Sequence, residues 1–506
     1  MGEKEETVLL QPVPVLMRFF HQLEEQGVAY CHFKSNQHLG EALSGETDVD
    51  LLVDKNSADR CEIVLKQNGF KRFVSQPWVT YPGIEDWIGY DEEQGKIVHI
   101  HLHYQLLSGL KFVKEQHLPW EQLLLKTAER HPLYGVYVTN PHLELILLAV
   151  RISIKTSNWQ LLKAYLGTTP LPKNIIAEYE YLLEHADPRR VKDVAVRLFG
   201  RNDGMALCQW IMDKKLSEPT VIRAIRAMVK RHYREHQRYS GLNLYWVQLA
   251  RFYKVAVSRL KRKLKLSGQK GKRPHKGGLI IALVGCDGSG KSTLSKALVE
   301  TLSKKVDIQN VYLGSGDGRV SLSVSVAKSL WALFKRLRGK SGEKPKHGKR
   351  EKKKYQAAWK NVADALFAVL VANDRYRKLK KARQDKLNGW LIVTDRYPQN
   401  QFPGLNDGPY IELAGHETWL ERWAARLEQK RFERFRQLQP DLVIKLSISV
   451  EVAFARKPVY SPDDIRQKVE IVEKLSFPGA KVVTIDATQP LEQVKKQVTK
   501  VVWETL

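Results

Sequence analysis

A glycine-rich stretch near the middle of the chain, "LVGCDGSGKSTL" at residues 283–294, constrains the fold more than any other feature. Gly285, Gly290, Lys291 and Ser292 fit the spacing G-x-x-x-x-G-K-[ST], which predicts a loop whose backbone N–H groups enclose a phosphate. Glycine lets the backbone curl, lysine supplies a point charge to the β- and γ-phosphates, and the serine hydroxyl reaches Mg²⁺. The spacing therefore predicts a site for the phosphates of a nucleotide.

The residues on both sides of this loop have the pattern that the motif requires. "LIIALV" at 279–284 is an apolar run with the length of a buried strand. After the loop, Leu294, Ala297, Leu298 and Leu302 recur at helical spacing. The N-terminus of that helix directs its partial positive charge at a bound anion. A glycine-rich turn without a nucleotide is the alternative interpretation, and flanks of this kind argue against it.

Further strands follow the loop. The segments that predict them are "NVYLGSG" at 310–316, "GWLIVTDRYPQ" at 389–399, "PDLVIKLSISVEVAFARK" at 440–457 and "AKVVTIDATQPLEQVKKQV" at 480–498. Short apolar runs alternate here with long amphipathic stretches, which is typical of an α/β fold with a parallel sheet flanked by helices. Charged residues after a strand, such as Asp395 and Arg396, then lie in a ligand crevice at the sheet edge.

From Gly277 to the C-terminus, these segments resemble the thymidylate kinase family, a branch of the P-loop nucleoside monophosphate kinases. The loop with an acid at Asp287, "DRY" at 395–397, the strand at 440–457 and "IDATQPLEQV" carry the resemblance. It implies a P-loop kinase that uses ATP and Mg²⁺ and places its reactants mainly by electrostatics.

The resemblance also implies a donor site. Lys291 and Ser292 would hold the donor phosphates and Mg²⁺, and Asp395 would help to order the ion and its waters. The nucleotide-binding residues that it predicts in the loop are Gly285, Asp287, Gly288, Ser289, Gly290, Lys291, Ser292 and Thr293.

For the acceptor, the resemblance places Asp287 near the sugar, Arg396 on the phosphate and Arg375 on the base. Arg456 and Arg466 fall where a basic lid closes over the donor, with Arg456 counted among the catalytic residues beside Lys291, Asp395 and Arg396. For the two lid arginines, an exposed helix face is the competing interpretation.

Three features depart from the family pattern. "PQNQFPGLNDGPY" at 398–410 replaces the usual serine-rich stretch, and Val371 stands where an aromatic residue stacks on the base. A basic tract at 335–354 is foreign to the compact enzymes, and reads either as a solvated loop or as a patch for an anionic polymer or membrane. The acceptor therefore stays open between a nucleotide, a sugar and another phosphate-bearing small molecule.

Upstream, "HFKSNQHLGEALSGETDVDLLVDK" at 32–55 contains a second candidate site. Asp48 and Asp50 are two residues apart, so on a strand they share one face and can hold a divalent metal ion. The arrangement resembles the nucleotidyltransferase superfamily, with Lys34 and Ser35 in place of its Gly-Ser pair. Ordinary turn and strand-edge acids are the alternative interpretation of the two aspartates.

That superfamily takes a third carboxylate from a later strand, and the matching segment here is "KIVHIHLHYQLL" at 96–107. It presents His99, His101 and His103 on one face and no acid. Alternating histidines can bind metal, and they occur more often as a surface or packed strand face. The N-terminal site is accordingly expected to be altered or inactive relative to the superfamily.

Composition divides the chain into regions. We expect an α+β nucleotidyltransferase-like domain at 1–140, a helical region at 141–266, a basic linker at 267–277 and the P-loop domain at 278–506. The linker "SGQKGKRPHKGG" contains Gly, Pro and Lys and no apolar residue.

The formal net charge of +28 indicates an anionic partner, or else lysine-rich linkers that carry the excess. Cys31, Cys61, Cys208 and Cys286 form no C-x-x-C pair, and together with the charged N-terminus and the lack of a long apolar run they favour reduced thiols and a cytoplasmic location.

Three classes of function fit these patterns. The first is an ATP- and Mg²⁺-dependent kinase for a small anionic acceptor, joined to a nucleotidyltransferase-like domain of uncertain activity. The second is a nucleic-acid end-processing enzyme, which the basic charge would suit. The third is a regulatory protein that a nucleotide switches.

Overall fold

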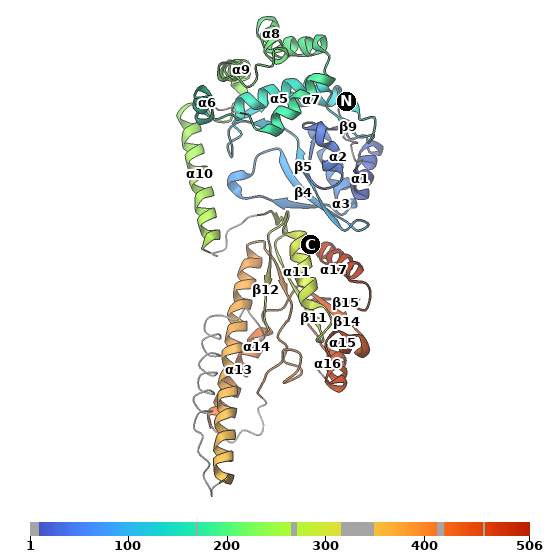
Figure 1. Cartoon of the computed structure of the whole chain (residues 1–506), viewed down its shortest axis with the longest axis vertical. Coiled ribbons are helices and arrows are strands. Elements are labelled where there is room, and N and C mark those ends of the chain that lie inside the picture. The colour runs from blue at the N-terminus through green and yellow to red at the C-terminus, as the bar shows by residue number, and fades with distance from the viewer. Residues whose placement is uncertain (1–9, 168–170, 265–270, 315–348, 412–418, 459–460) are drawn as a thin grey trace. The chain divides into compact units, whose positions relative to one another are not determined.

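A computed structural model describes residues 10–167, 171–264, 271–314, 349–411, 419–458 and 461–506 (Figure 1). The chain forms two compact units, residues 1–272 and 273–506. The basic tract predicted at 335–354 lies outside the described residues, apart from the backbone of its last helical turns. The N-terminal unit contains both the predicted α+β region and the predicted helical region.

The C-terminal unit is built on a sheet with the strand order β12-β13-β11-β14-β15. Every neighbouring pair in it is parallel, as the alternation of apolar runs and amphipathic stretches predicted. Its strands are β11 (Leu279–Gly285), β12 (Ile308–Val311), β13 (Leu391–Thr394), β14 (Leu442–Ser447) and β15 (Lys481–Asp486). The two-residue strand β10 (Arg273–Pro274) precedes them.

Helices cover both faces of this sheet. They are α11 (Lys291–Leu302), α13 (Lys349–Leu387), α14 (Trp419–Phe435), α15 (Val450–Arg456), α16 (Pro462–Lys474) and α17 (Leu491–Thr505). Ile280, Ala282 and Val284 alternate along β11 and pack against α13, α14 and α16. On the other face lie α11 and α17, which also contact each other. Figure 1 shows α13 and α17 on opposite sides of β11.

Local sequence explains where the helices next to β14 begin. The Ser449 hydroxyl accepts a hydrogen bond from the backbone N–H of Val452 and starts α15. Ser461 does the same for Asp464 at the start of α16, where Pro462 occupies the first turn. Arg456 is the last residue of the short helix α15, which approaches the glycine-rich loop after β11.

The N-terminal unit has a mixed sheet with the strand order β3-β4-β5-β2-β1-β9-β8. Pairs β2–β5 and β1–β9 are parallel and the other pairs are antiparallel. The strands are β1 (Tyr30–His32), β2 (Val49–Val53), β3 (Lys71–Val74), β4 (Ile84–Asp91), β5 (Lys96–His103), β8 (Glu129–Arg130) and β9 (Tyr137–Val138); β6 (Leu106–Ser108) and β7 (Gln116–Leu118) form a separate hairpin.

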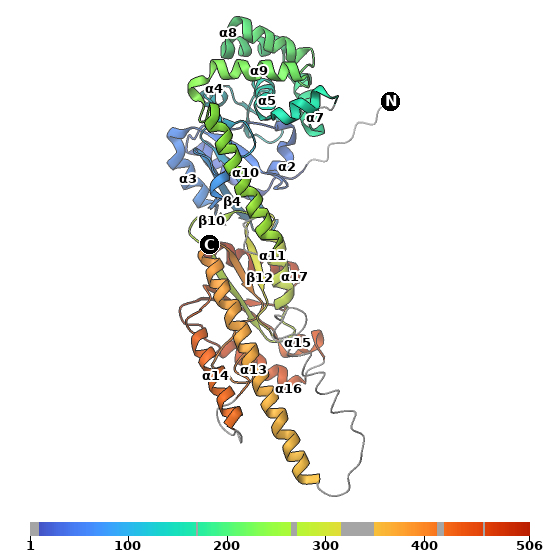
Figure 2. The ribbon, with the colours of Figure 1, turned by 90° about the vertical axis from the view of Figure 1, so that its left-hand side faces the viewer.

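Two groups of helices form the cores on the two faces of this sheet. The first group is α1 (Pro14–Glu25), α2 (Leu39–Leu43) and α3 (Ala58–Gln67). The second includes α4 (Glu121–Lys126), α5 (Pro141–Lys155), α6 (Asn158–Tyr165), α7 (Lys173–His185), α8 (Pro188–Met212) and α9 (Pro219–His232). Figures 1 and 2 show α10 (Gly241–Lys263) as a continuous helix at the edge of this unit.

The alternation of side chains along β2 decides which face carries the predicted acids. Val49, Leu51 and Val53 pack against α1, α2 and α3, whereas Leu52 belongs to the core formed with α5. Asp50 has the parity of Leu52, so it projects to the face that α5 covers. The helical region at 141–266 is therefore part of the surroundings of Asp50.

None of the described helices is long and apolar enough to cross a bilayer. The four cysteines are buried and unbridged, which agrees with the prediction of free thiols.

Candidate functional site

The glycine-rich loop at residues 286–290, here called the phosphate loop, joins β11 to α11. Its backbone adopts conformations that only glycine takes up readily. Gly288 and Gly290 both have φ of +89°, a region that L-residues with side chains rarely adopt. A Cβ atom on Gly288 would lie 2.9 Å from the carbonyl oxygen of Ala453. Glycine is thus required at 288 both for conformation and for the close approach of α15.

Lys291 is the first residue of α11, and its side chain folds back over the loop. The Nζ atom donates to the carbonyl oxygens of Gly285 at 2.8 Å and Cys286 at 2.7 Å. Burial, with a further contribution from Arg396, lowers the pKa of Lys291 to about 8. The two carbonyl oxygens carry only partial negative charge. A phosphate in the loop would give the Lys291 ammonium a fully charged partner.

Ser292 and Asp395 meet at the carboxyl edge of the sheet. The hydroxyl of Ser292 donates to Oδ2 of Asp395 at 3.1 Å, although the two residues are 103 positions apart. Oδ1 of Asp395 is buried and has no hydrogen-bond partner among the described residues. Burial raises the pKa of Asp395 above its usual value. One hydroxyl beside an unsatisfied carboxylate oxygen is a donor set that suits Mg²⁺.

Arg396 links the loop to the segment after β13. Its Nη2 lies 3.4 Å from Oδ1 of Asp287, and its Nη1 lies 3.4 Å from Oδ1 of Asp407. Nζ of Lys468 on α16 lies 2.7 Å from Oδ2 of Asp287. Burial tends to raise the pKa of Asp287, but Lys468, Lys291 and Arg396 outweigh that effect and lower it. The result is a charged network along one rim of the loop.

A cavity of about 470 Å³ opens above the loop. Besides residues 287–294, its walls contain Arg396 and Arg456 from the predicted set. Its other lining residues are Lys457, Ala487, Gln489, Leu491 and Val494. Arg456 donates to the carbonyl oxygen of Ala487 at 3.1 Å and is thereby held at the wall.

Four predicted residues of the C-terminal unit are not among those that line this cavity: Gly285, Asp395, Arg466 and Arg375. Gly285 is the last residue of β11, and Asp395 accepts a hydrogen bond from Ser292, which does line the cavity. Arg466 pairs with Asp463 at 3.1 Å on the exposed surface of α16. Arg375 is 1% exposed; it donates to the carbonyl oxygen of Leu313 at 2.8 Å and to Asp407 at 2.9 Å. Arg375 therefore supports the segment that carries Asp407, which in turn pairs with Arg396.

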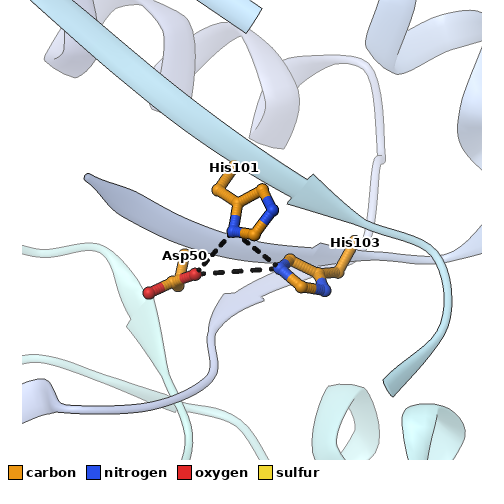
Figure 3. Close-up of side chains that lie close together, drawn as sticks. All are labelled: Asp50, His101 and His103. Atoms are coloured by element: carbon orange, nitrogen blue, oxygen red, sulfur yellow. Dashed lines mark hydrogen bonds and ion pairs between the residues drawn. The ribbon is translucent and has the colours of Figure 1, made fainter. Parts of the chain in front are cut away.

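A second group of polar side chains lies on the sheet of the N-terminal unit (Figure 3). Oδ1 of Asp50 on β2 lies 3.1 Å from Nδ1 of His101 and 3.7 Å from Nε2 of His103, both on β5. The two ring nitrogens are 3.2 Å apart. Among the described residues, these are the three that could share one metal ion.

Asp48 does not join that group. Its Oδ1 lies 2.9 Å from Nδ1 of His99, whose Nε2 lies 3.0 Å from Oδ1 of Asp86 on β4. The two predicted acids thus face different histidines. Asp86 is an acid near this group that the sequence analysis did not identify, and it lies opposite His101 in the antiparallel register of β4 and β5.

Basic side chains surround Asp50. Nζ of Lys34 lies 2.7 Å from its Oδ1. Arg151 and Lys155 project from one face of α5, and Lys114 comes from the loop before β7, with φ of +47°. Arg151 lowers the pKa of Lys155 to about 6, aided by burial, Lys34 and Lys114. Burial and Lys34 lower the pKa of Lys114 to about 8.

Sequence reasoning missed several of these residues for a common reason. Asp407, Lys468, Lys114, Arg151 and Lys155 stand in no recognisable motif, and only folding brings them to the two sites. The one available signal was position: Asp407 lies in the unusual segment after "DRY", and Lys468 lies two residues after the predicted lid arginine at 466.

The C-terminal unit is thus an α/β protein whose parallel sheet ends in a glycine-rich loop with a basic cavity. Two relatives are the uncharacterized ATP-binding proteins YghS and YghR of Escherichia coli strain K12. YghS is 34% identical over 221 residues, which are 42% of this chain and 88% of YghS; YghR is 31% identical over 226 residues, 44% of this chain and 86% of YghR. The chain belongs to the family of these two proteins. No protein-family model matches it.

The contacts of Arg375 lead to a prediction about stability. Replacing Arg375 by Met should destabilise the C-terminal unit by about 3 kcal/mol, because it removes the donor to the buried carbonyl of Leu313 and leaves Asp407 with its longer, 3.4 Å contact to Arg396. The matched control is Arg377→Met, an exposed position on the same helix, with an expected effect within about 0.5 kcal/mol. Urea unfolding of the full chain, with hydrogen exchange of peptides from β11 and β13, measures both; equal effects would contradict the structural role of Arg375.

Proposed function

We propose that the C-terminal unit is a Mg²⁺- and ATP-dependent phosphotransferase, similar to thymidylate kinases, that acts on a small phosphate-bearing acceptor. The observation that carries this proposal is that Lys291, Ser292, Arg396 and Arg456 line one cavity over the phosphate loop, with Ser292 hydrogen-bonded to Asp395. YghS and YghR are named as ATP-binding proteins, which supports ATP as the nucleotide.

The donor half of the proposed reaction rests on the loop. The backbone N–H groups at the start of α11 and the Lys291 ammonium would hold the β- and γ-phosphates. Ser292 and Asp395 would hold Mg²⁺, which would supply positive charge to neutralise the donor phosphates. The cavity volume of about 470 Å³ is in the usual range for a small-molecule site.

The acceptor half rests on Arg396. Its guanidinium is held between Asp287 and Asp407, so little side-chain entropy remains to be lost when an anionic acceptor binds. Arg456 stands at the wall of the same cavity, where its charge can stabilise a transferring phosphoryl group. This proposal defines the acceptor by its phosphate and not by a base. Arg375, expected to bind the base, contacts Leu313 and Asp407, and Val371, expected beside the base, is buried.

For the N-terminal unit we propose a nucleotidyltransferase-like fold. Asp50 on β2 lies beside β5, on the sheet face that α5 covers, and Asp48 precedes the same strand. The pairing of each aspartate with a histidine supports the expectation of an altered site.

The phosphotransferase proposal is tested by Lys291→Ala. Loss of the ammonium should reduce acceptor-dependent conversion of ATP to ADP by at least about a hundredfold, because a charge aimed at the transferring phosphate is removed. The matched control is Lys296→Ala, an exposed lysine on the same helix, which should retain wild-type turnover.

The measurement is a screen of nucleotides, sugar phosphates, sugars and oligonucleotide ends as acceptors, with coupled detection of ADP. Turnover that survives in the Lys291 variant would remove the kinase assignment. Turnover that requires an oligonucleotide end would replace the small acceptor by nucleic acid.

The lowered pKa of Lys291 generates a prediction that does not depend on the acceptor. In the free protein, Lys291 is partly deprotonated at about pH 8.5, and phosphate charges beside it would raise its pKa. ATP binding at that pH should therefore take up protons, and less so near pH 7, where Lys291 is already charged. Calorimetry in buffers of different ionisation enthalpy measures this uptake. Lys291→Met should abolish it; equal uptake in that variant would show that another group titrates.

A further inference from the structure

The group Asp50, His101 and His103 has the dimensions of one face of a tetrahedral metal site. The three ligand atoms are separated by 3.1, 3.2 and 3.7 Å. A tetrahedral Zn²⁺ with bonds of about 2.0–2.1 Å places neighbouring ligand atoms about 3.3–3.4 Å apart. Figure 3 shows the three atoms directed at one another from two adjacent strands, so only small side-chain shifts are needed to share an ion.

The backbone holds this arrangement in place. Asp50 is in register with His101 across the parallel pair β2–β5, and His103 follows two residues later on the same face. The ring of His103 packs edge-on against Phe33, with ring centroids 4.8 Å apart. Its Nδ1 has no hydrogen-bond partner among the described residues, so the polar contacts of this ring pass through Nε2.

The three side chains bring one carboxylate oxygen and two imidazole nitrogens to within 4.8 Å of one another. One carboxylate together with two imidazoles is a ligand set typical of zinc-class ions rather than of Mg²⁺.

The charge around the group indicates what would complete the site. Lys34 lies on the same oxygen of Asp50 that the ion would use, and Lys114, Arg151 and Lys155 lie nearby. Oε1 of Glu178 lies 3.8 Å from Nη1 of Arg151 and also accepts a hydrogen bond from the Ser35 hydroxyl at 3.1 Å. A divalent ion beside these four basic side chains would add positive charge, which a bound anion would offset. Phosphate oxygens can bind both a metal ion and basic side chains.

We propose that Asp50, His101 and His103 bind a zinc-class divalent ion, whose open coordination position takes an oxygen of a phosphate-bearing ligand that the neighbouring Lys34, Lys114, Arg151 and Lys155 attract. This site belongs to the N-terminal unit and is independent of the phosphate loop. His101 and His103 are its distinguishing ligands, since carboxylates alone would favour Mg²⁺.

The test uses the full-length, tag-free chain without nucleotide and with Co²⁺ as a spectroscopic substitute for Zn²⁺. Titration should give the intense visible absorption of a tetrahedral cobalt centre at one ion per chain, and Zn²⁺ should displace it. Asp50→Asn and His101→Asn should each weaken binding by at least about tenfold. The matched control is His21→Asn, an exposed histidine paired with Glu25, which should bind like wild type.

Lys34→Met separates a metal site from a structural hydrogen-bond cluster. Removing the competing ammonium should strengthen Co²⁺ binding by at least about threefold, because Asp50 is then free of its ion pair. Circular dichroism and thermal unfolding check that each variant is folded; if Asp50→Asn is not, His101→Asn and Lys34→Met decide. An absent cobalt spectrum, unchanged affinity in His101→Asn, or weaker binding in a folded Lys34→Met variant would overturn the metal site.

Inorganic phosphate tests the second part of the proposal. Millimolar phosphate should increase the affinity of the protein for Co²⁺, after correction for the binding of Co²⁺ by phosphate in a control without protein. This increase in affinity should be smaller in Lys155→Ala and Arg151→Met. By linkage, Co²⁺ should tighten phosphate binding by the same factor. Equal Co²⁺ affinity with and without phosphate would overturn the assignment of the anion.

Discussion

Parallel pairing of β11 with β13 and β14 is the constraint on which the C-terminal site depends. It brings the carboxyl ends of the three strands to one edge of the sheet, with Ala282 opposite Thr394 and Gly285 opposite Leu446. The loop after β11 and the residues Asp395 and Arg396 after β13 therefore meet, although about a hundred residues separate them in sequence. The helix α11 then starts at this edge, so that its N-terminus and Lys291 serve the same cavity.

Ion pairs fix the position of Arg396 at the edge of the sheet. Arg396 lies between Asp287 and Asp407, and Asp407 is also held by the buried Arg375. Arg396, beside the phosphate loop, is thus placed by a chain of contacts that ends in the long helix α13. Such a chain makes the site sensitive to residues that touch no ligand, because each buried charge depends on the next for its partner.

The N-terminal unit uses the same principle with different chemistry. The pair β2–β5 sets Asp50 beside His101, and α5 adds Arg151 and Lys155 above the same face. Carboxylate, imidazole and ammonium groups therefore gather at one place on a mixed sheet. The two units share one property, a concentration of basic side chains around a few acids, which accounts for part of the net charge of +28.

The sequence by itself determined the elements that local pattern controls. The run at 279–294 specified a strand, a glycine-requiring loop and a helix, and the later apolar runs specified a parallel sheet flanked by helices; the structure confirms these predictions. The period of two in "HIHLH" placed three histidines on one face. Local pattern works here because φ, hydrophobic spacing and capping depend on near neighbours in the chain.

Only the tertiary structure decided which distant groups meet. It paired Asp48 with His99 and Asp50 with His101, gave Arg375 a supporting contact, and placed Arg466 on an exposed helix face while Arg456 lines the cavity. Strand register and helix packing set these distances, and both arise from the burial of whole faces rather than from any short motif.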